Sequence, residues 1–277
     1  MSFRILCIGD VVGQPGREIL KARLPALKEE RRIDFVVANG ENAAGGSGLT
    51  SKVLREILEA GVDVVTSGDH VYKNKEVFEC LGDERLLRPL NYVPAAAGHG
   101  AGLFVSKAGA RVAVVNLVGR VFMNPAECPF LAADTILDTL RRDADLIVVD
   151  IHAEATSEKI AMGWHLDGRV TAVVGTHTHV PTADERILPG GTAYLTDLGM
   201  TGAFDSVLGR DKESVLYHFT TAMPARFAVA TGDVRLCAAL IAADPQTGRA
   251  LSIERLMLYR EREAGDAKED GNPAESL

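Results

Sequence analysis

The sequence has no run of apolar residues that approaches the roughly 20 a membrane-spanning helix needs. Its start, MSFRILCIGD, also lacks the cationic beginning and apolar segment of a secretory signal. Cysteine is scarce: Cys7, Cys80, Cys128 and Cys237 are scattered and form no CxxC pair. Disulfides and thiolate metal sites are therefore not expected. We predict a cytoplasmic protein with buried free thiols and no membrane contact.

Positively charged residues are fewer than negatively charged ones. The chain has 30 Lys and Arg residues against 38 Asp and Glu residues, a formal net charge of −8. This negative balance disfavours an extended positively charged surface that could bind a nucleic-acid backbone, so no stable nucleic-acid binding is expected. A small anionic substrate in a locally positive pocket remains compatible with it. The sequence leaves open whether the chain forms a homo-oligomer.

Apolar strand-like runs alternate with helix-like segments in the first half of the chain. The strand-like runs are FRILCIGD, DFVVANGEN and VDVVTSGDH, and the helix-like segments that follow them are GREILKARLPALKEERR, TSKVLREILEAG and NKEVFECLGD. This rhythm predicts a largely parallel sheet with right-handed crossovers. Residues 101–119 instead contain two β-rich runs around a turn-like SKAGA, which predicts an antiparallel hairpin.

The second half repeats the pattern and ends in strands. A helix is expected over about residues 130–142, another in TSEKIAMGWHL, and strands in DLIVVDIHAE and VTAVVGTHTH. Residues 226–259 read as strands joined by TGD and DPQTG turns. We expect residues 1–259 to form a single domain. Residues 260–277 are charged and almost free of large apolar residues, which predicts a disordered tail.

Polar side chains stand where the predicted strands end. They are Asp10, Glu41, Asn42, Asp69, His70, His152, His177 and His179. In an open parallel sheet such ends lie along one edge, where α/β proteins bind ligands, and residues i and i+2 of a strand face the same side. Each residue alone has an ordinary explanation as a turn residue, a helix cap or a satisfied core group. Together, four of the seven histidines and three carboxylates at strand ends favour a metal site.

Carboxylate and imidazole ligands without a thiolate suit Fe or Mn ahead of Zn or Mg. There are too many candidate ligands for one ion with an open position, whereas two divalent ions about 3.5 to 4 Å apart that share a carboxylate would use them all. Such a centre attracts phosphate oxygens and activates water. The reaction it supports best is phosphoester hydrolysis.

The series GD, NGEN, GDH, a lone His and GTHTH resembles the calcineurin-like metallophosphoesterases. Within them, the chain resembles the YmdB-like phosphodiesterases from about Arg4 to about Glu254. The blocks that carry this resemblance are IGDVVGQPGR, VANGENAAGGSGLT, VDIHAEATSEK and VVGTHTHVPTADERILPGGTAYLTDLGM. The resemblance implies a four-layer αββα sandwich with two mixed sheets flanked by helices, a dimetal centre, and hydrolysis of 2′,3′-cyclic nucleotides and 3′,5′-cyclic AMP.

The resemblance also implies a role for each residue. Asp10 and His179 would hold one metal, Asp69, His152 and His177 the other, and Glu41 would bridge both. Asn42 would bind a substrate phosphate oxygen and approach a metal. His70 would be the general acid that protonates the leaving oxygen, and the nucleophile would be a hydroxide that bridges the metals.

Two positions depart from the family pattern. Val12 stands where the superfamily usually has a histidine, which leaves the first metal fewer protein ligands, and Asp69 stands where the family more often has Asn. The extra negative charge of Asp69 would weaken the second metal as a Lewis acid or favour a more oxidised iron. Two alternatives stay open: a phosphomonoesterase or phosphoprotein phosphatase on the same centre, and a metal-containing regulatory binding module with weak turnover.

Overall fold

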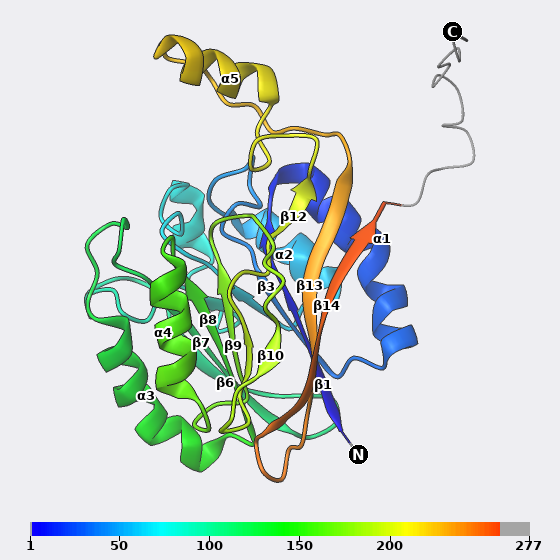
Figure 1. Cartoon of the computed structure of the whole chain (residues 1–277), viewed down its shortest axis with the longest axis vertical. Helices are drawn as coiled ribbons and strands as arrows, with labels where there is room; N and C mark the ends of the chain where they lie inside the picture. Colours follow the sequence, from blue (N-terminus) through cyan, green and yellow to red (C-terminus); the bar gives the residue numbers. More distant parts are fainter. Residues whose placement is uncertain (1, 261–277) are drawn as a thin grey trace, which may run out of the picture.

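Two β-sheets pack face to face in the computed structural model, which describes residues 2–260, and helices cover both outer faces (Figure 1). The first sheet has the order β2-β12-β13-β1-β3-β4-β5, with β14 paired to β13. Its strands are β1 (Phe3–Ile8), β2 (Asp10–Val11), β3 (Phe35–Asn39), β4 (Val64–Thr66), β5 (Leu86–Leu87), β12 (Met200–Ala203), β13 (Val234–Ala243) and β14 (Ala250–Tyr259). Strands β1, β3, β4 and β5 run parallel, while β13 runs antiparallel to β1.

The second sheet has the order β10-β11-β9-β8-β7-β6. Its strands are β6 (Ala101–Val105), β7 (Arg111–Val118), β8 (Leu146–His152), β9 (Ala172–Thr176), β10 (Arg186–Ile187) and β11 (Ala193–Leu195). Strands β7, β8, β9 and β11 run parallel, and the two edge strands, β6 and β10, are antiparallel to their neighbours. Both sheets are therefore mixed, as predicted.

Three separate hydrophobic cores define the four layers. The central core fills the space between the sheets and includes Val37, Val148 and Val174. A second core packs the first sheet against α1 (Gly13–Arg31) and α2 (Ser51–Glu59), and a third packs the second sheet against α3 (Pro129–Asp143) and α4 (Thr156–Leu166). The predicted αββα sandwich is confirmed.

Helix α5 (Lys212–Thr221) lies outside these four layers. In Figure 1 it projects from the end of the molecule at which β12 lies. Most of its side chains are exposed, and Val215 is its one buried residue.

Several local predictions are confirmed. The hairpin expected over residues 101–119 is the antiparallel pair β6–β7, and the helices expected near 130–142 and in TSEKIAMGWHL are α3 and α4. All four cysteines are free; Cys7, Cys80 and Cys237 are buried as predicted, whereas Cys128 is only half-buried. Among residues 2–260, no helix combines the length and apolarity needed to cross a bilayer.

Two local predictions are wrong. The helix expected in NKEVFECLGD is only a 3₁₀ turn, η1 (Lys75–Glu79), because its backbone bonds from Val77 to Asn74 and from Cys80 to Val77 span three residues. Residues 226–230 form no strand, since this segment leads away from α5 and pairs only through the single bridge of Val229 with Arg210. The tail predicted over 260–277 lies outside the described residues apart from Arg260.

Candidate metal centre

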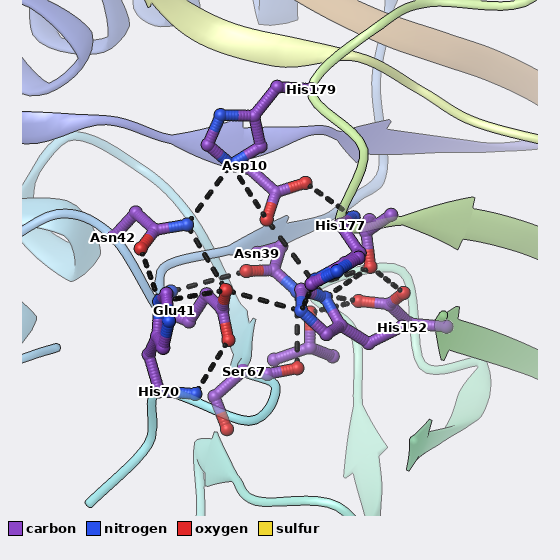
Figure 2. A network of polar contacts seen from close by, with 12 residues as sticks. Asp10, Asn39, Glu41, Asn42, Ser67, His70, His152, His177 and His179 are labelled. Carbon is purple, nitrogen blue, oxygen red and sulfur yellow. Dashed lines mark hydrogen bonds and ion pairs between the residues drawn. The ribbon is translucent and has the colours of Figure 1, made fainter. Parts of the chain in front are cut away.

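Polar side chains from both sheets meet at the carboxyl ends of five strands (Figure 2). The first sheet contributes residues that follow β1, β3 and β4, and the second contributes residues at or after the ends of β8 and β9. The residues that come together are Asp10, Glu41, Asn42, Asp69, His70, His152, His177 and His179. We expected one edge of a single sheet, but the site is built across the two packed sheets, because their parallel strands end on the same side of the sandwich.

One group of four side chains is especially close. Glu41, Asp69, His152 and His177 each bring one ligand atom to within 4.8 Å of the other three. Nε2 of His152 lies 3.2 Å from Oε1 of Glu41 and 3.3 Å from Oδ1 of Asp69. Nδ1 of His177 lies 3.5 Å from the same Asp69 oxygen. Two carboxylates and two imidazoles at this spacing are a donor set for a divalent cation.

A second group lies beside the first and shares Glu41 with it. Nε2 of His179 is 3.8 Å from Oδ1 of Asp10. The side-chain nitrogen of Asn42 lies 3.1 Å from that His179 nitrogen and donates to Oε1 of Glu41, also at 3.1 Å. Figure 2 shows Asn42 linking His179 above to Glu41 below. Glu41 therefore stands between the two groups.

Two buried carboxylate oxygens in this site have no hydrogen-bond partner, Oδ1 of Asp10 and Oδ1 of Asp69. A buried carboxylate oxygen without a partner is costly, so it needs a cation or a donor nearby. Both oxygens face imidazole nitrogens at more than 3.2 Å, a spacing at which a cation between them can contact both sides. The residues therefore fit divalent metal ions, and sulfur ligands are not needed.

The charges of the site depend on one another. Burial opposes ionisation of Glu41, but His152 and His70 outweigh it and lower the pKa of that carboxyl. Burial also opposes the charge on His152, yet Glu41 and Asp69 raise the pKa of His152 well above its ordinary value. Complete burial raises the pKa of Asp10 to about 6. A site whose carboxylates raise the pKa of a buried imidazole is a site that attracts positive charge.

The loop after β9 turns its two histidines toward different parts of the site. Strand β9 ends at Thr176, and His177 and His179 have φ values of 99° and 65°. The expectation that strand alternation makes both face one side is wrong, because neither residue lies in a strand. His177 faces Asp69, whereas His179 faces Asp10. Positive φ in a residue other than glycine costs about 1–3 kcal/mol, so the surroundings must hold this loop.

Gly68 lets the chain pass close to the ligands. A Cβ atom at this position would lie 2.2 Å from Cδ2 of His152 and 2.3 Å from Oε2 of Glu41. Any side chain here would displace both residues. The glycine of the GDH motif is therefore required by space next to the metal site.

His70 lies on the open side of the site, and 34% of its side chain is exposed. Its Nδ1 is 2.9 Å from the carbonyl oxygen of the Asn42 side chain, so Nδ1 carries a proton and donates it. Its backbone N–H donates to Oε2 of Glu41 at 3.2 Å. The other ring nitrogen, Nε2, is 3.8 Å from Oδ2 of Asp69 and is the one left for a ligand.

A buried network that the sequence analysis missed orients His152. Nδ1 of His152 lies 2.9 Å from the hydroxyl of Thr176, which donates its own proton to Asp150 at 2.7 Å. The Thr176 oxygen must then accept a hydrogen bond from Nδ1–H of His152, which leaves Nε2 for a cation. Thr66 and Asn39 also donate to Asp150. The available signal was the presence of these polar residues inside otherwise apolar strands.

Glu154 orients the ring of His177 in a similar way, and it was also absent from the site residues predicted from the sequence. Its Oε2 lies 3.1 Å from Nε2 of His177, and half of its side chain is exposed. The bond keeps the proton of His177 on Nε2, so Nδ1 points its lone pair at Asp69 and His152. Its position two residues after His152, just beyond the strand, was the signal.

Two of the three remaining histidines have side-chain partners elsewhere in the fold. His165 lies 2.9 Å from Asp134, and Nδ1 of His218 lies 2.9 Å from the carbonyl oxygen of Met223. Neither these two nor His99 belongs to either ligand group.

The chain is similar to known proteins over almost its whole length. The sequence model of the family described as "YmdB-like protein" matches residues 6–256. A relative from Bacillus subtilis named "2′,3′-cyclic-nucleotide 2′-phosphodiesterase" is 48% identical over 257 residues, which cover 92% of this chain and 97% of that protein. A hypothetical protein of Thermus thermophilus superposes with a TM-score of 0.88 at 42% identity, covering 94% of this chain and all of the other. A structure described as a novel phosphatase of Mycoplasma pneumoniae superposes with a TM-score of 0.87 at 36% identity, covering 94% of each chain.

Proposed function

The chain belongs to the YmdB-like family and is an enzyme that hydrolyses phosphodiesters, and we propose that it does so with two metal ions, acting on cyclic nucleotides. The observation that carries this proposal is the position of Glu41. Its Oε1 atom lies 3.2 Å from Nε2 of His152 in one ligand group and 3.1 Å from the nitrogen of Asn42, which contacts His179 in the other. A carboxylate in this place can serve two ions at once.

The proposed ligands divide between the two groups. Asp10 and His179 would hold one ion, Asp69, His152 and His177 the other, and Glu41 both, with Asn42 close to the first. Two divalent ions so held would activate a water molecule and stabilise the attacking and leaving oxygens of an in-line displacement. The ligand types favour Fe or Mn, with Zn or Mg behind them.

Asn42 and His70 would handle the substrate and the leaving group. The Asn42 amide would donate to a phosphate oxygen that enters between the two groups. His70 is held by its Nδ1 proton on Asn42, so its Nε2 can carry a second proton toward the site. His70 would pass that proton to the leaving oxygen.

The proposed substrates are 2′,3′-cyclic nucleotides, which the Bacillus subtilis relative is named for, and 3′,5′-cyclic AMP. For the former, an oxygen from water would bond to phosphorus, the bond from phosphorus to O2′ would break, and O2′ would take the proton from His70. The product would be a 3′-phosphate. No redox partner or further reactant is needed.

Two loops border the site and would frame the substrate. The first follows β7, whose last residue, Val118, pairs with His152, and Glu158 holds it by accepting the backbone N–H groups of Arg120 and Val121. The second contains Leu208, whose carbonyl oxygen lies 3.1 Å from Nδ1 of His179.

A phosphomonoesterase is the second candidate, favoured by the phosphatase description of the Mycoplasma pneumoniae structure. Turnover of bis-p-nitrophenyl phosphate against p-nitrophenyl phosphate separates the two. Faster turnover of the diester supports the proposal, whereas faster turnover of the monoester supports the phosphatase. A His70→Ala variant that loses turnover but keeps its cellular effect would favour the regulatory binding module.

The bridging role of Glu41 has a direct test. Glu41→Ala should bind fewer than two metal ions per chain and lose turnover, because both ligand groups lose a donor. Full metal content and full activity in this variant would show that the bridging assignment is wrong.

Three expectations from the sequence stay predictions. They are the single domain over residues 1–259, the cytoplasmic location, and the weakening of the second metal as a Lewis acid by the extra negative charge of Asp69.

A further inference from the structure

A buried ion pair lies next to the metal site and has no part in the mechanism proposed above. Nζ of Lys159 on α4 is 2.6 Å from Oδ2 of Asp197, and the two side chains are 0% and 1% exposed. Burying two charges is expensive, and a buried pair often stabilises a fold no better than apolar residues of the same size. Its presence therefore calls for a role beyond stability.

Asp197 holds the loop that carries both histidine ligands. Its Oδ2 atom accepts the hydroxyl of Thr178 at 2.7 Å and the backbone N–H of Thr178 at 3.2 Å. Thr178 stands between His177 and His179, the two residues whose backbone has positive φ. The carboxylate thus binds the middle of a loop whose backbone conformation is unfavourable for residues other than glycine.

The other oxygen of Asp197 reaches the opposite ligand group. Oδ1 accepts the backbone N–H of Gly199 at 2.8 Å, and the carbonyl oxygen of Gly199 accepts the backbone N–H of Asp10 at 3.1 Å. The approach is tight, since a Cβ atom on Gly9 would lie 1.9 Å from that carbonyl oxygen. One carboxylate therefore connects to the backbone on both sides of the site.

Lys159 supplies the charge that such a carboxylate needs. Its side chain runs beneath the end of β9, where a Cβ atom on Gly175 would lie 2.9 Å from Cδ of Lys159. It thus reaches Asp197 from the helix layer and contacts Oδ2, the same oxygen that accepts from Thr178. The ammonium group balances the buried negative charge while leaving Oδ2 able to accept from Thr178.

We propose that Lys159 and Asp197 are a positioning pair, which sets His177, His179 and Asp10 in the geometry that binds the metal ions. Neither residue touches the substrate. This inference rests on the proposed function, because it concerns the same ligands.

The test uses Thr178, since its substitution removes one bond to Asp197 without burying an unpaired charge. Thr178→Val lacks the hydroxyl, and Thr178→Ser restores it. Metal-free forms of both variants and of the natural chain are titrated with Mn²⁺, and their melting temperatures and far-UV circular dichroism confirm folding. Residues that orient metal ligands typically change affinity 10- to 100-fold, so Thr178→Val should bind Mn²⁺ at least about tenfold more weakly, and Thr178→Ser as the natural chain does.

The ion pair itself is tested with Lys159→Met, for which Lys28→Met is the matched control. Lys28 bonds to the carbonyl oxygen of Gly61, before the start of β4 and therefore at the other end of the sheet. At saturating Mn²⁺, Lys159→Met should lower kcat for bis-p-nitrophenyl phosphate while KM changes less, and Lys28→Met should change neither. If Lys159→Met fails to fold, the Thr178 variants decide the question.

A folded Thr178→Val protein with unchanged Mn²⁺ affinity and kcat would overturn the inference and leave the proposed function standing. A natural chain that binds no Mn²⁺, Fe²⁺ or Zn²⁺ would instead overturn the proposed function. The two failures are therefore distinguishable.

Discussion

Nδ1 of His177 lies 3.0 Å from Nε2 of His152, and the two rings meet edge to face at 77°. Two imidazole nitrogens at this distance cannot both carry a proton between them. Asp69 lies close to both nitrogens, with Oδ1 at 3.5 Å and 3.3 Å. The arrangement has room for one positive centre, either a proton or a metal ion.

Metal binding should therefore release a proton. The carboxylates raise the pKa of His152 well above its usual value, so without metal this ring is charged at pH 7. Burial and the charge of His152 lower the pKa of His177 to about 4, which leaves that ring neutral. Because a metal ion needs the deprotonated Nε2 of His152, binding should expel about one proton and weaken as pH falls.

Calorimetric titration of the metal-free chain with Mn²⁺ in two buffers of different ionisation enthalpy measures this proton. Equal heats in both buffers would contradict the expectation. His165→Gln removes a histidine that lies outside both ligand groups and should release the same number of protons as the natural chain.

Gly68→Ala should damage the site without unfolding the chain. The added methyl group would push against His152 and Glu41, and a displacement of about 1 Å at a catalytic group can cost 100-fold in rate. We expect kcat to fall by about that factor and metal content to drop. Gly82→Ala is the control, since a Cβ atom there would meet nothing within 4 Å. Similar metal content and kcat in the two variants would contradict the steric argument.

His70→Ala should slow the hydrolysis of substrates with a poor leaving group more than that of substrates with a good one. Loss of a general acid typically costs about 10²–10⁴ in rate, and that loss should appear with a 2′,3′-cyclic nucleotide, whose leaving alkoxide needs a proton. With bis-p-nitrophenyl phosphate the loss should be much smaller, since p-nitrophenolate leaves as a stable anion. Metal content should stay unchanged. Equal losses for both substrates would remove His70 from the role of acid.

Glu154 should affect His177 through its hydrogen bond. Glu154→Ala removes the acceptor for Nε2–H and should weaken metal binding about 10- to 100-fold. Glu154→Gln keeps an acceptor oxygen and should retain most of the affinity. A Glu154→Ala variant with the metal affinity of the natural chain would show that the bond does not orient the ring.

The residues that meet at the site were predictable because functional side chains in α/β proteins lie at the carboxyl ends of strands. Asp10, Glu41 and His152 follow or end apolar runs that are recognisable in the sequence. The family resemblance implied two sheets, but the apolar runs by themselves did not predict a site that lies across both, since β3 and β8 look alike as apolar runs and their pairing depends on tertiary packing. The backbone of His177 and His179 was also missed, because positive φ has no clear signature outside glycine. Lys159 is a further case: a lysine on a helix suggests a solvated side chain, and only the position of Asp197 explains its burial.

The most direct measurement of the central claim is the metal content per chain of protein purified without added metal, followed by turnover of a 2′,3′-cyclic nucleotide before and after chelation. We predict close to two Fe or Mn ions per chain and hydrolysis that chelation abolishes and metal restores. Protein that takes up no metal on reconstitution, or that hydrolyses the substrate equally well after complete metal removal, would contradict the account.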